Sequence, residues 1–439
     1  KASDYLIKSA EKSLKRYALE EAHKYFQEAY DLLSHKPGKS IAEKKLIIDL
    51  ILEWAMVFYY RCDGRGWKNL FSSHKELAES LDDPERLAMF YAWHGFVFLS
   101  EDNKKAMNLL QKALEIGETL ENQKIIGYAC TWLTWVCNDL SRYEEALQYG
   151  ARAQKISKFV ESDHYIYFKS LAAIAMCYWE IGAPKQLNKI GKDLLEYGQK
   201  HANIRCQTMG HMTLGGAYNL AGDLPRFIKC FHKASDVSAD TMYEISAKTW
   251  LGMGYLLNNQ IQEAEASLKE AFDFCKENEF DWTGKPSQLF LGTAMIAKGD
   301  MNRGFKMIEE AHRSFIREGR KYHMALTEYI LGKIYSQIVD GSGSVSPLSL
   351  IKNIGFVVKN VPFADQKADS HFKKAIEGAK AIGAKSVLGP TYLDWGLLHK
   401  VKKRTDQARE CITKAIKIFQ EWEAEIYLKQ AREAQTSLS

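Results

Sequence analysis

The 439-residue chain contains little proline and no long uninterrupted apolar stretch. Its 8 prolines favour helices over a loop-rich β fold. No run of 18 apolar residues occurs, so the sequence predicts no membrane span. No basic segment followed by an apolar one opens the chain, so we expect no secretory signal. The expected location is the cytoplasm, without a membrane partner.

Paired cysteines and a strong charge of one sign are also missing. None of the 8 cysteines forms a Cys-x-x-Cys pair, and most fall inside apolar helical patterns. This usage is typical of reduced core residues in a cytoplasmic protein. The 60 basic and 55 acidic side chains leave a net charge of only +5. A nucleic-acid module usually carries a strongly basic face, so we expect no nucleic-acid partner.

Motifs that carry chemistry are absent as well. The glycine-rich stretch "DGSGSVSP" at 340–347 lacks the lysine and the preceding strand of a phosphate-binding loop. Neither a His-Glu-x-x-His metal pair nor a Gly-x-Ser-x-Gly nucleophile turn occurs. The sequence therefore predicts a segment that is not an enzyme and that holds no cofactor and no metal.

What the chain does contain is an internal repeat with a period of about 40 residues, a length that is typical of stacked helical units. Gly252, Gly292 and Gly332 recur at equal intervals of one period. The next equivalent, Gly396, comes much later than one period after Gly332, so the array is interrupted between them. The equivalent positions earlier in the chain are Gly95, Thr134, Ala175 and Gly215.

A second pattern follows most of these small anchors. Pairs of alanines recur seven residues apart, which is two turns on one helix face. A bulky residue lies between the two alanines of most pairs. We interpret each unit as a hairpin in which the first helix needs a small residue where the second helix crosses closely. The pairs are Ala22/Ala29, Ala106/Ala113, Ala146/Ala153, Ala264/Ala271, Ala368/Ala375 and Ala408/Ala415.

The sequence thus predicts an all-α, right-handed superhelix of about ten hairpins, one inserted helix and a C-terminal capping helix. We expect one continuous array over 1–439. The predicted hairpins are 3–35, 41–81, 86–121, 125–161, 164–201, 205–240, 243–278, 283–319, 322–384 with an insertion at 340–363, and 387–420, followed by a cap at 421–437.

The repeat resembles the tetratricopeptide repeat, in which Leu-Gly is followed by Tyr three residues on and then by Ala-x3-Phe-x2-Ala. "LGGAYNLAGDLPRFIKCFHKA" at 214–234 and "LGKIY" at 331–335 carry the resemblance most fully. The period exceeds the length of about 34 residues that is usual for this repeat. The helices or links are therefore expected to be longer than average.

The chain also resembles one bacterial family, the C-terminal tetratricopeptide region of adenylate/guanylate cyclases that carry a central ATPase domain. The resemblance covers nearly the whole chain, and the interrupted ninth hairpin is its most specific mark. No catalytic residue of the family has a counterpart here. The stretches that carry the resemblance to this family are "YYRCDGRGWKNLFSSHKELAESL" at 59–81, "IGYACTWLTWVCNDL" at 126–140, "DHYIYFKSLAAIAMCYW" at 163–179 and "LGKIYSQIVDGSGSVSPLSLIKNIGFVVKNVPFADQKADSHFKKAIE" at 331–377.

This resemblance implies a regulatory, non-catalytic role in signal transduction. The implied partner is a protein or peptide segment, including the cyclase and ATPase domains of the parent protein, and a homo-oligomer is compatible with it. A second interpretation stays open. Similar long-repeat arms occur in ATPase-type transcription activators, where they bind a small inducer. The two interpretations differ in what fills the groove of the array.

The first helices of the N-terminal half are unusually aromatic on the stripe that should face that groove. The candidate groove residues are Phe96, Tyr128, Trp135, Met176 and Trp179. A helix that is apolar all round is usually buried, so an adjacent hairpin covering these side chains is one explanation. A docking groove for an apolar helix or peptide is the other.

The insertion in the ninth hairpin predicts one extra helix. Ser346 and Pro347 are suited to its first positions, and Pro362 prevents its continuation. Its apolar side, with Ile351, Ile354 and Val358, must be buried on something. It either packs on the array itself or contacts a second subunit or the catalytic part of the parent.

Deleting 341–362 and joining the ends with a short turn should leave a folded, soluble array. Repeat stability is mostly a sum of local and nearest-neighbour terms, and the insertion lies between the two helices of one hairpin. If the extra helix is a contact element, light scattering should show a changed oligomeric state. Aggregation or unfolding of the deletion variant would show that the helix is structural instead.

Overall fold

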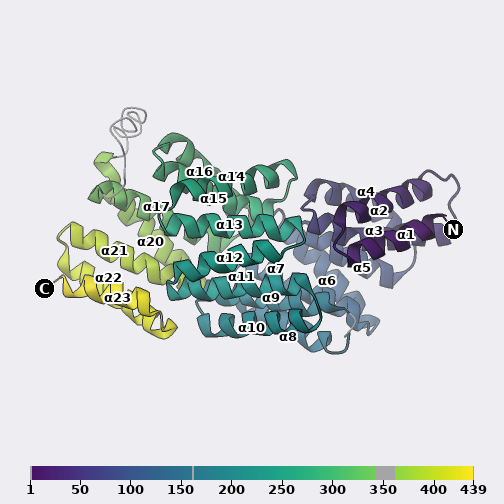
Figure 1. Cartoon of the computed structure of the whole chain (residues 1–439), viewed down its shortest axis with the longest axis horizontal. Coiled ribbons are helices and arrows are strands. Elements are labelled where there is room, and N and C mark those ends of the chain that lie inside the picture. The colour runs from purple at the N-terminus through teal and green to yellow at the C-terminus, as the bar shows by residue number, and fades with distance from the viewer. Residues whose placement is uncertain (1, 161–162, 342–360, 439) are drawn as a thin grey trace.

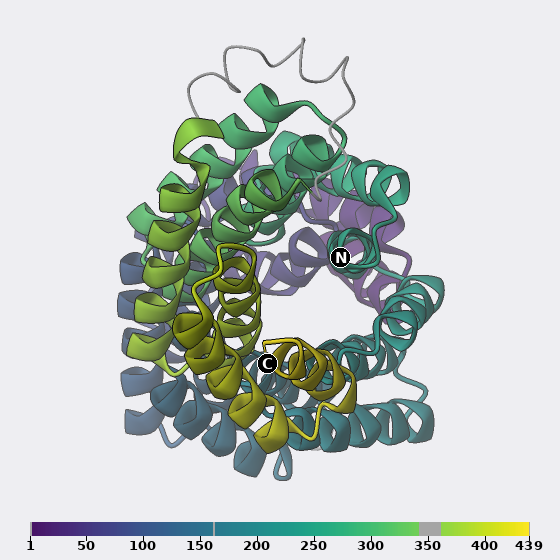
Figure 2. The same cartoon turned by 90° about the vertical axis from the view of Figure 1, so that its left-hand side faces the viewer.

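The computed structural model describes residues 2–160, 163–341 and 361–438, and within these ranges it contains helices and no strand. The expected all-α fold is confirmed. The helices stack side by side into an elongated array whose two chain ends lie at opposite ends of its long axis (Figure 1). Viewed along that axis, the hairpins wind around a common centre (Figure 2).

Consecutive helices pair as antiparallel hairpins. The first five pairs are α1 (Ala2–Lys15) with α2 (Leu19–Ser34), α3 (Ile41–Tyr60) with α4 (Gly64–Glu79), α5 (Pro84–Val97) with α6 (Asn103–Thr119), α7 (Gln123–Asp139) with α8 (Tyr143–Ser157), and α9 (His164–Ile181) with α10 (Pro184–Lys200).

The later pairs follow the same order and end in a single helix, α23 (Glu425–Thr436). They are α11 (Ile204–Ala221) with α12 (Leu224–Val237), α13 (Thr241–Leu257) with α14 (Ile261–Glu277), α15 (Asp281–Ala297) with α16 (Met301–Glu318), α17 (Lys321–Asp340) with α20 (Ala364–Ile382), and α21 (Lys385–Val401) with α22 (Thr405–Trp422). A short 3-10 turn, η1 (Val361–Phe363), precedes α20. The helix expected at the insertion, with Ile351, Ile354 and Val358, lies outside the described residues.

The small anchors explain how closely the helices of one hairpin approach. A Cβ added to Gly252 on α13 would lie 2.3 Å from the side chain of Leu268 on α14. A Cβ at Gly332 on α17 would lie 2.7 Å from the ring of Phe372 on α20. Real Cβ atoms are essentially never this close to another heavy atom. The predicted reason for a small residue at each anchor is therefore confirmed at these hairpins.

Short polar side chains begin many of these helices. Ser40 and Glu43 form a capping box at the start of α3, and each accepts a hydrogen bond from the backbone N–H of the other. The side chains of Asp83, Asp102 and Asn122 accept backbone hydrogen bonds at the starts of α5, α6 and α7. These bonds satisfy amide donors that have no partner inside the helix, so the helix starts are set locally.

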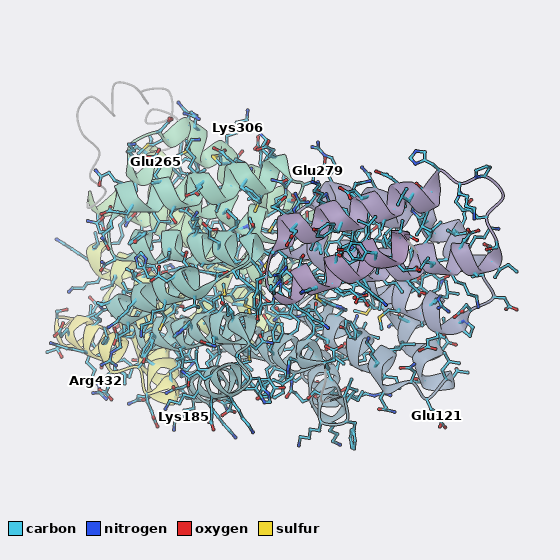
Figure 3. The ribbon with its side chains drawn as sticks, turned by 45° about the vertical axis from the view of Figure 1, so that its right-hand side comes forward. Glu121, Lys185, Glu265, Glu279, Lys306 and Arg432 are labelled. Carbon is cyan, nitrogen blue, oxygen red and sulfur yellow. The ribbon has the colours of Figure 1, made fainter. Side chains whose placement is uncertain are left out.

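The surface carries charged side chains of both signs. Figure 3 labels Glu121, Lys185, Glu265, Glu279, Lys306 and Arg432 on the outside of the array. Several of these pair with an opposite charge; Lys185 lies 2.7 Å from Glu423, and Glu279 lies 2.8 Å from Arg65. Exposed pairs of this kind contribute little to stability, so the fold depends on packing between hairpins. Among the described residues, no helix is long and apolar enough to cross a membrane.

Contacts also join hairpins that are distant in sequence. The backbone N–H of Gly64 on α4 donates to the carbonyl of Asn278, which follows α14, over 3.0 Å. A Cβ at Gly64 would lie 2.3 Å from the carbonyl oxygen of Glu279. Further along, Ser386 on α21 donates its hydroxyl to the carbonyl of Glu180 on α9. The array therefore winds tightly enough for a later turn to rest on an earlier one.

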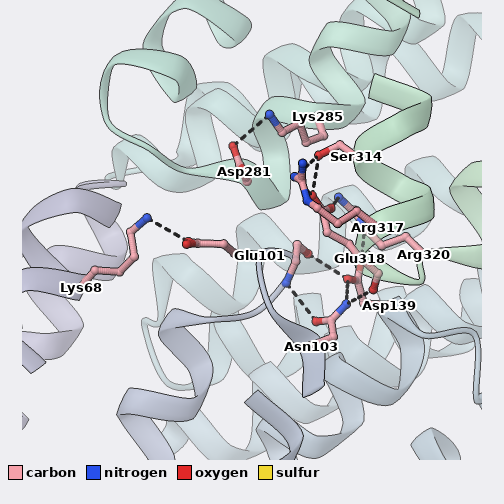
Figure 4. A network of polar contacts seen from close by, with 11 residues as sticks. Lys68, Glu101, Asn103, Asp139, Asp281, Lys285, Ser314, Arg317, Glu318 and Arg320 are labelled. Carbon is pink, nitrogen blue, oxygen red and sulfur yellow. Dashed lines mark hydrogen bonds and ion pairs between the residues drawn. The ribbon is translucent and has the colours of Figure 1, made fainter. Parts of the chain in front are cut away.

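A buried ionic cluster, made of Asp139, Arg320 and Glu318, is another of these distant contacts (Figure 4). The Arg320 Nε lies 2.9 Å from the Asp139 carboxylate, and the two side chains are only 1% and 5% exposed. Asn103 donates to both the Asp139 carboxylate and the Glu318 carbonyl. The cluster joins α6 and α7 to the end of α16 and the residue before α17. Because the charged groups of the cluster are shielded from water, each one is stabilised by its ionic and hydrogen-bonding partners and not by hydration.

Replacing Arg320 with Met should cost about 3–5 kcal/mol of unfolding free energy, because the buried Asp139 carboxylate then loses its cation, whereas Glu318 keeps Arg317 at 3.0 Å. Adding Asp139→Asn to that variant should recover part of the loss, since the uncompensated charge then disappears. Urea denaturation of both variants followed by circular dichroism measures the difference. Equal stability of the wild-type chain and the Arg320→Met variant would show that the cluster does not hold the turns together.

Candidate binding cavity on the inner face

A cavity of about 530 Å³ lies on the inner side of the array. Its wall comes from the first helices of consecutive hairpins, from α7 through α9, α11, α13, α15 and α17 to α21, with α23 closing one side. These helices line the inside because their partners in each hairpin form the outer layer. The volume falls in the range of about 300–1,000 Å³ that is usual for ligand pockets.

Aromatic and methionine side chains form about a third of the wall. Trp179 donates its indole N–H to the side chain of Asn219 over 3.1 Å, and its ring lies 4.8 Å from that of Trp250. Trp135 donates to the carbonyl of Lys169 over 3.2 Å and meets Trp282 edge-on at 5.0 Å. These hydrogen bonds fix the rings in place. Partly exposed members of the wall include Met176, Met212, Trp250, Met253 and Trp282.

The structure divides the five groove residues that the sequence placed on one stripe. Trp135, Met176 and Trp179 line the cavity. Phe96 and Tyr128 do not belong to its lining; Phe96 stacks on Trp132, and Tyr128 stacks on Tyr165 with 5.3 Å between ring centres. Both are buried among rings of neighbouring first helices, at 3% and 5% exposure. A binding role for any of the five stays a prediction.

The division has a physical cause in the way the array coils. In the N-terminal hairpins the first helices pack against one another and against α13, so the aromatic stripe there is covered. Tyr59 on α3, for example, donates its hydroxyl to the sulfur of Met242 on α13. From α7 onward the stripes of successive first helices diverge and leave the cavity between them. Periodicity within one hairpin carries no information on which stripe a distant hairpin covers.

The sequence placed Lys169 on the groove stripe of the fifth hairpin, but it missed the other charged groups of the wall. Lys333 on α17 lies 3.1 Å from the carboxylate of Asp394 on α21, and Tyr329 donates to the same carboxylate over 2.8 Å. The negative charge of Asp394 is the main cause that raises the pKa of Lys333. Lys333 directly follows the small anchor Gly332. Trp135, Met176 and Met253 directly follow the anchors of their own hairpins. The position of Lys333 in the repeat was therefore the sequence signal that could have placed it in the cavity wall.

Glu180 on α9 is a buried acid at the same wall. Its carboxylate accepts hydrogen bonds from the hydroxyl of Tyr143, over 2.8 Å, and from the amide of Asn138, over 3.4 Å. Burial raises its pKa from the ordinary value of 4.5 to about 8. The side chain is therefore mostly a neutral acid at pH 7. Among the described residues, no group of three or more potential metal-ligating side chains occurs.

Replacing Glu180 with Gln should make stability less dependent on pH. Because the folded-state pKa of Glu180 is raised, its contribution to stability is present below about pH 4.5 and is lost as pH rises toward about 8. Between pH 5 and 9 the wild-type unfolding free energy should fall by roughly a few kcal/mol more than that of the variant. Urea denaturation at both pH values tests this. Glu144→Gln, at an exposed position on α8, is the control, and parallel pH curves for wild type and Glu180→Gln would contradict the expectation.

Comparison with known proteins finds similar structures but no similar family model or curated sequence. No family model matches the chain, and no curated protein matches it. A solved structure of a Rap protein complexed with competence and sporulation factor is similar over 86% of this chain and 98% of its own, with 12% identity and a TM-score of 0.56. NprR in complex with its cognate peptide NprX is similar over 86% of this chain and 99% of its own, with 12% identity and a TM-score of 0.50.

At 12% identity these likenesses concern the fold alone. The fold agrees with the small-anchor hairpins and the winding of the array described above. The chain is therefore an all-helical superhelix of tetratricopeptide-like repeats.

Proposed function

We propose that this chain is a non-catalytic regulatory segment that binds a largely apolar peptide or protein segment in its inner cavity. The observation that carries the proposal is the wall itself. Aromatic and methionine side chains from six successive first helices, α7 to α17, line one space of about 530 Å³, and α21 completes its wall. Such side chains provide large contact areas for an apolar ligand, and methionine adapts to its shape.

Two features of the wall suit a peptide. Its partly exposed residues come from helices spread along the array, so a ligand would touch several hairpins at once. Polar groups at fixed places, such as Asn219 and Asp394, offer partners for a peptide backbone among the apolar side chains. The two similar structures are of a Rap protein complexed with competence and sporulation factor and of NprR in complex with its cognate peptide NprX. Those ligands belong to those proteins, and they support the kind of ligand proposed here.

The resemblance of the sequence to the repeat region of cyclases with an ATPase domain suggests the role of such binding. In this proposal the parent is a nucleotide cyclase, and occupation of the cavity passes a signal to its catalytic part. The bound segment is then either a separate peptide or a segment of the parent.

A second candidate is a small apolar inducer, as in the arms of ATPase-type transcription activators. The observation that favours it is the size of the cavity, since about 530 Å³ suits a single small molecule. A peptide that reaches several hairpins makes fuller use of the wall, so we place it first.

Introducing a charge into the wall should abolish peptide binding without unfolding the chain. Peptides selected from a displayed random library on the whole chain should lose about 2 kcal/mol or more of binding free energy with Met253→Glu, because an apolar anchor contact is replaced by a carboxylate. Met253 is partly exposed, so the fold should tolerate the change. Fluorescence anisotropy of the labelled peptides measures the affinity.

Leu32→Glu is the matched control, because Leu32 is 55% exposed on α2 and does not line the cavity. It should leave affinity unchanged. If the selected peptides bind the Met253→Glu variant as well as the wild type, the cavity is not the peptide site. If the library yields no binder while small apolar molecules bind and are lost with Met253→Glu, the second candidate holds.

A further inference from the structure

Lys169 on α9 is a fully buried lysine inside a box of aromatic rings. Its side chain has 0% exposure, and its amino group donates to the hydroxyl of Tyr59 on α3. Five rings lie with their centres 4.6 to 5.9 Å from the amino nitrogen. They belong to Tyr59, Trp132, Trp135, Tyr243 and Trp282.

Within the described part of the chain, no carboxylate forms an ion pair with Lys169. The other cations of the cavity wall are paired: Arg320 with Asp139 at 2.9 Å, and Lys333 with Asp394 at 3.1 Å. Burial alone lowers the pKa of Lys169 well below its ordinary value of 10.5. An amine buried without an opposite charge is costly, because the charged form loses its hydration and gains no counter-ion. The wall therefore holds one basic side chain that has no acidic partner among the described residues.

The ring box and the cavity share a wall. Trp135, Tyr243 and Trp282 belong both to the box around Lys169 and to the cavity lining, which also includes Lys169 itself. Trp282 is only partly buried, and it meets Trp135 edge-on. Trp282 is the only one of the five rings that is partly exposed, so its displacement is the step that this inference requires for a ligand to reach the amino group. The remaining rings favour an ammonium ion over a neutral amine through cation–π attraction.

We infer that Lys169 is the specificity-determining residue of the cavity and receives the carboxylate of a largely apolar peptide. This inference rests on the proposed function. A carboxylate supplies the negative charge that the wall lacks and holds the amine in its protonated form. The resulting charge-assisted hydrogen bond lies in a water-poor site, where it discriminates strongly against a neutral group of the same shape. An amide, an ester or a cation at this point would leave the amine unpaired.

The inference predicts a preference for a free acid that disappears with Lys169. The probe is a dansyl-labelled apolar tripeptide of leucine and phenylalanine, prepared as the free acid and as the C-terminal amide. Wild-type protein should bind the acid about tenfold or more tightly than the amide, the difference expected of one hydrogen bond to a charged group. Lys169→Met, which keeps the length of the side chain without its amine, should lower the affinity for the acid to that for the amide. Dansyl fluorescence anisotropy measures both affinities.

Lys285→Met is the matched control. It removes a lysine from α15, the helix of Trp282, but Lys285 pairs with Asp281 and does not line the cavity. This variant should keep the preference for the acid. A far-ultraviolet circular dichroism spectrum establishes that each variant is folded, and the ratio of acid to amide affinity is insensitive to a general loss of cavity shape.

Each outcome has one meaning. A preference for the acid in wild type and Lys285→Met, lost in Lys169→Met, supports the inference. Equal binding of acid and amide by wild type overturns it and leaves the cavity as a peptide site. Binding of neither form overturns both this inference and peptide binding in the cavity. A dansyl-labelled undecanoic acid and its methyl ester form a second pair; if only these bind, with the acid preferred through Lys169, the carboxylate belongs to a small molecule and the peptide assignment is overturned.

Discussion

The contact on which the structure depends is the close approach of the two helices in each hairpin. A glycine on the first helix meets a bulky side chain of the second, as Gly252 meets Leu268 and Gly332 meets Phe372. With no Cβ in the way, the helices approach until the bulky group fills the space over the glycine backbone. The alanines two turns apart on the second helix are fully buried at the same interface, as Ala264 and Ala271 are. This packing is local, so every hairpin forms the same unit with different side chains elsewhere.

Repetition of that unit determines the long-range contacts. Because each hairpin is placed on the last with a similar rotation, the array coils until a later turn meets an earlier one. The contacts between the two turns are specific polar interactions. The Gly64 N–H donates to the Asn278 carbonyl, the Ser386 hydroxyl donates to the Glu180 carbonyl, and the Arg320 guanidinium pairs with the Asp139 carboxylate. Buried polar groups need partners of matching geometry, so these pairs specify how the turns meet, whereas apolar packing alone would allow sliding.

The cavity is a consequence of the same coiling. First helices line the inside of each turn, so their inward stripes become one shared wall. Asp139, Glu180 and Arg320 belong both to the contacts between distant hairpins and to the cavity lining. Occupation of the cavity and the contact between turns involve the same side chains.

The sequence by itself determined the repeat unit and the fold class, since both depend on contacts within a hairpin, where spacing in sequence is spacing in space. Gly252, Leu268 and the paired alanines were readable as anchors for that reason. It also identified Trp135, Met176 and Trp179 as inward-facing. Only the tertiary structure decided that Phe96 and Tyr128 are covered while those three line a cavity, and that Lys169 lies among rings from α3, α7, α13 and α15. Those neighbours belong to hairpins that are distant in the chain. The angle through which each hairpin turns on the last, which brings them together, is the sum of many side-chain contacts that no periodic pattern encodes.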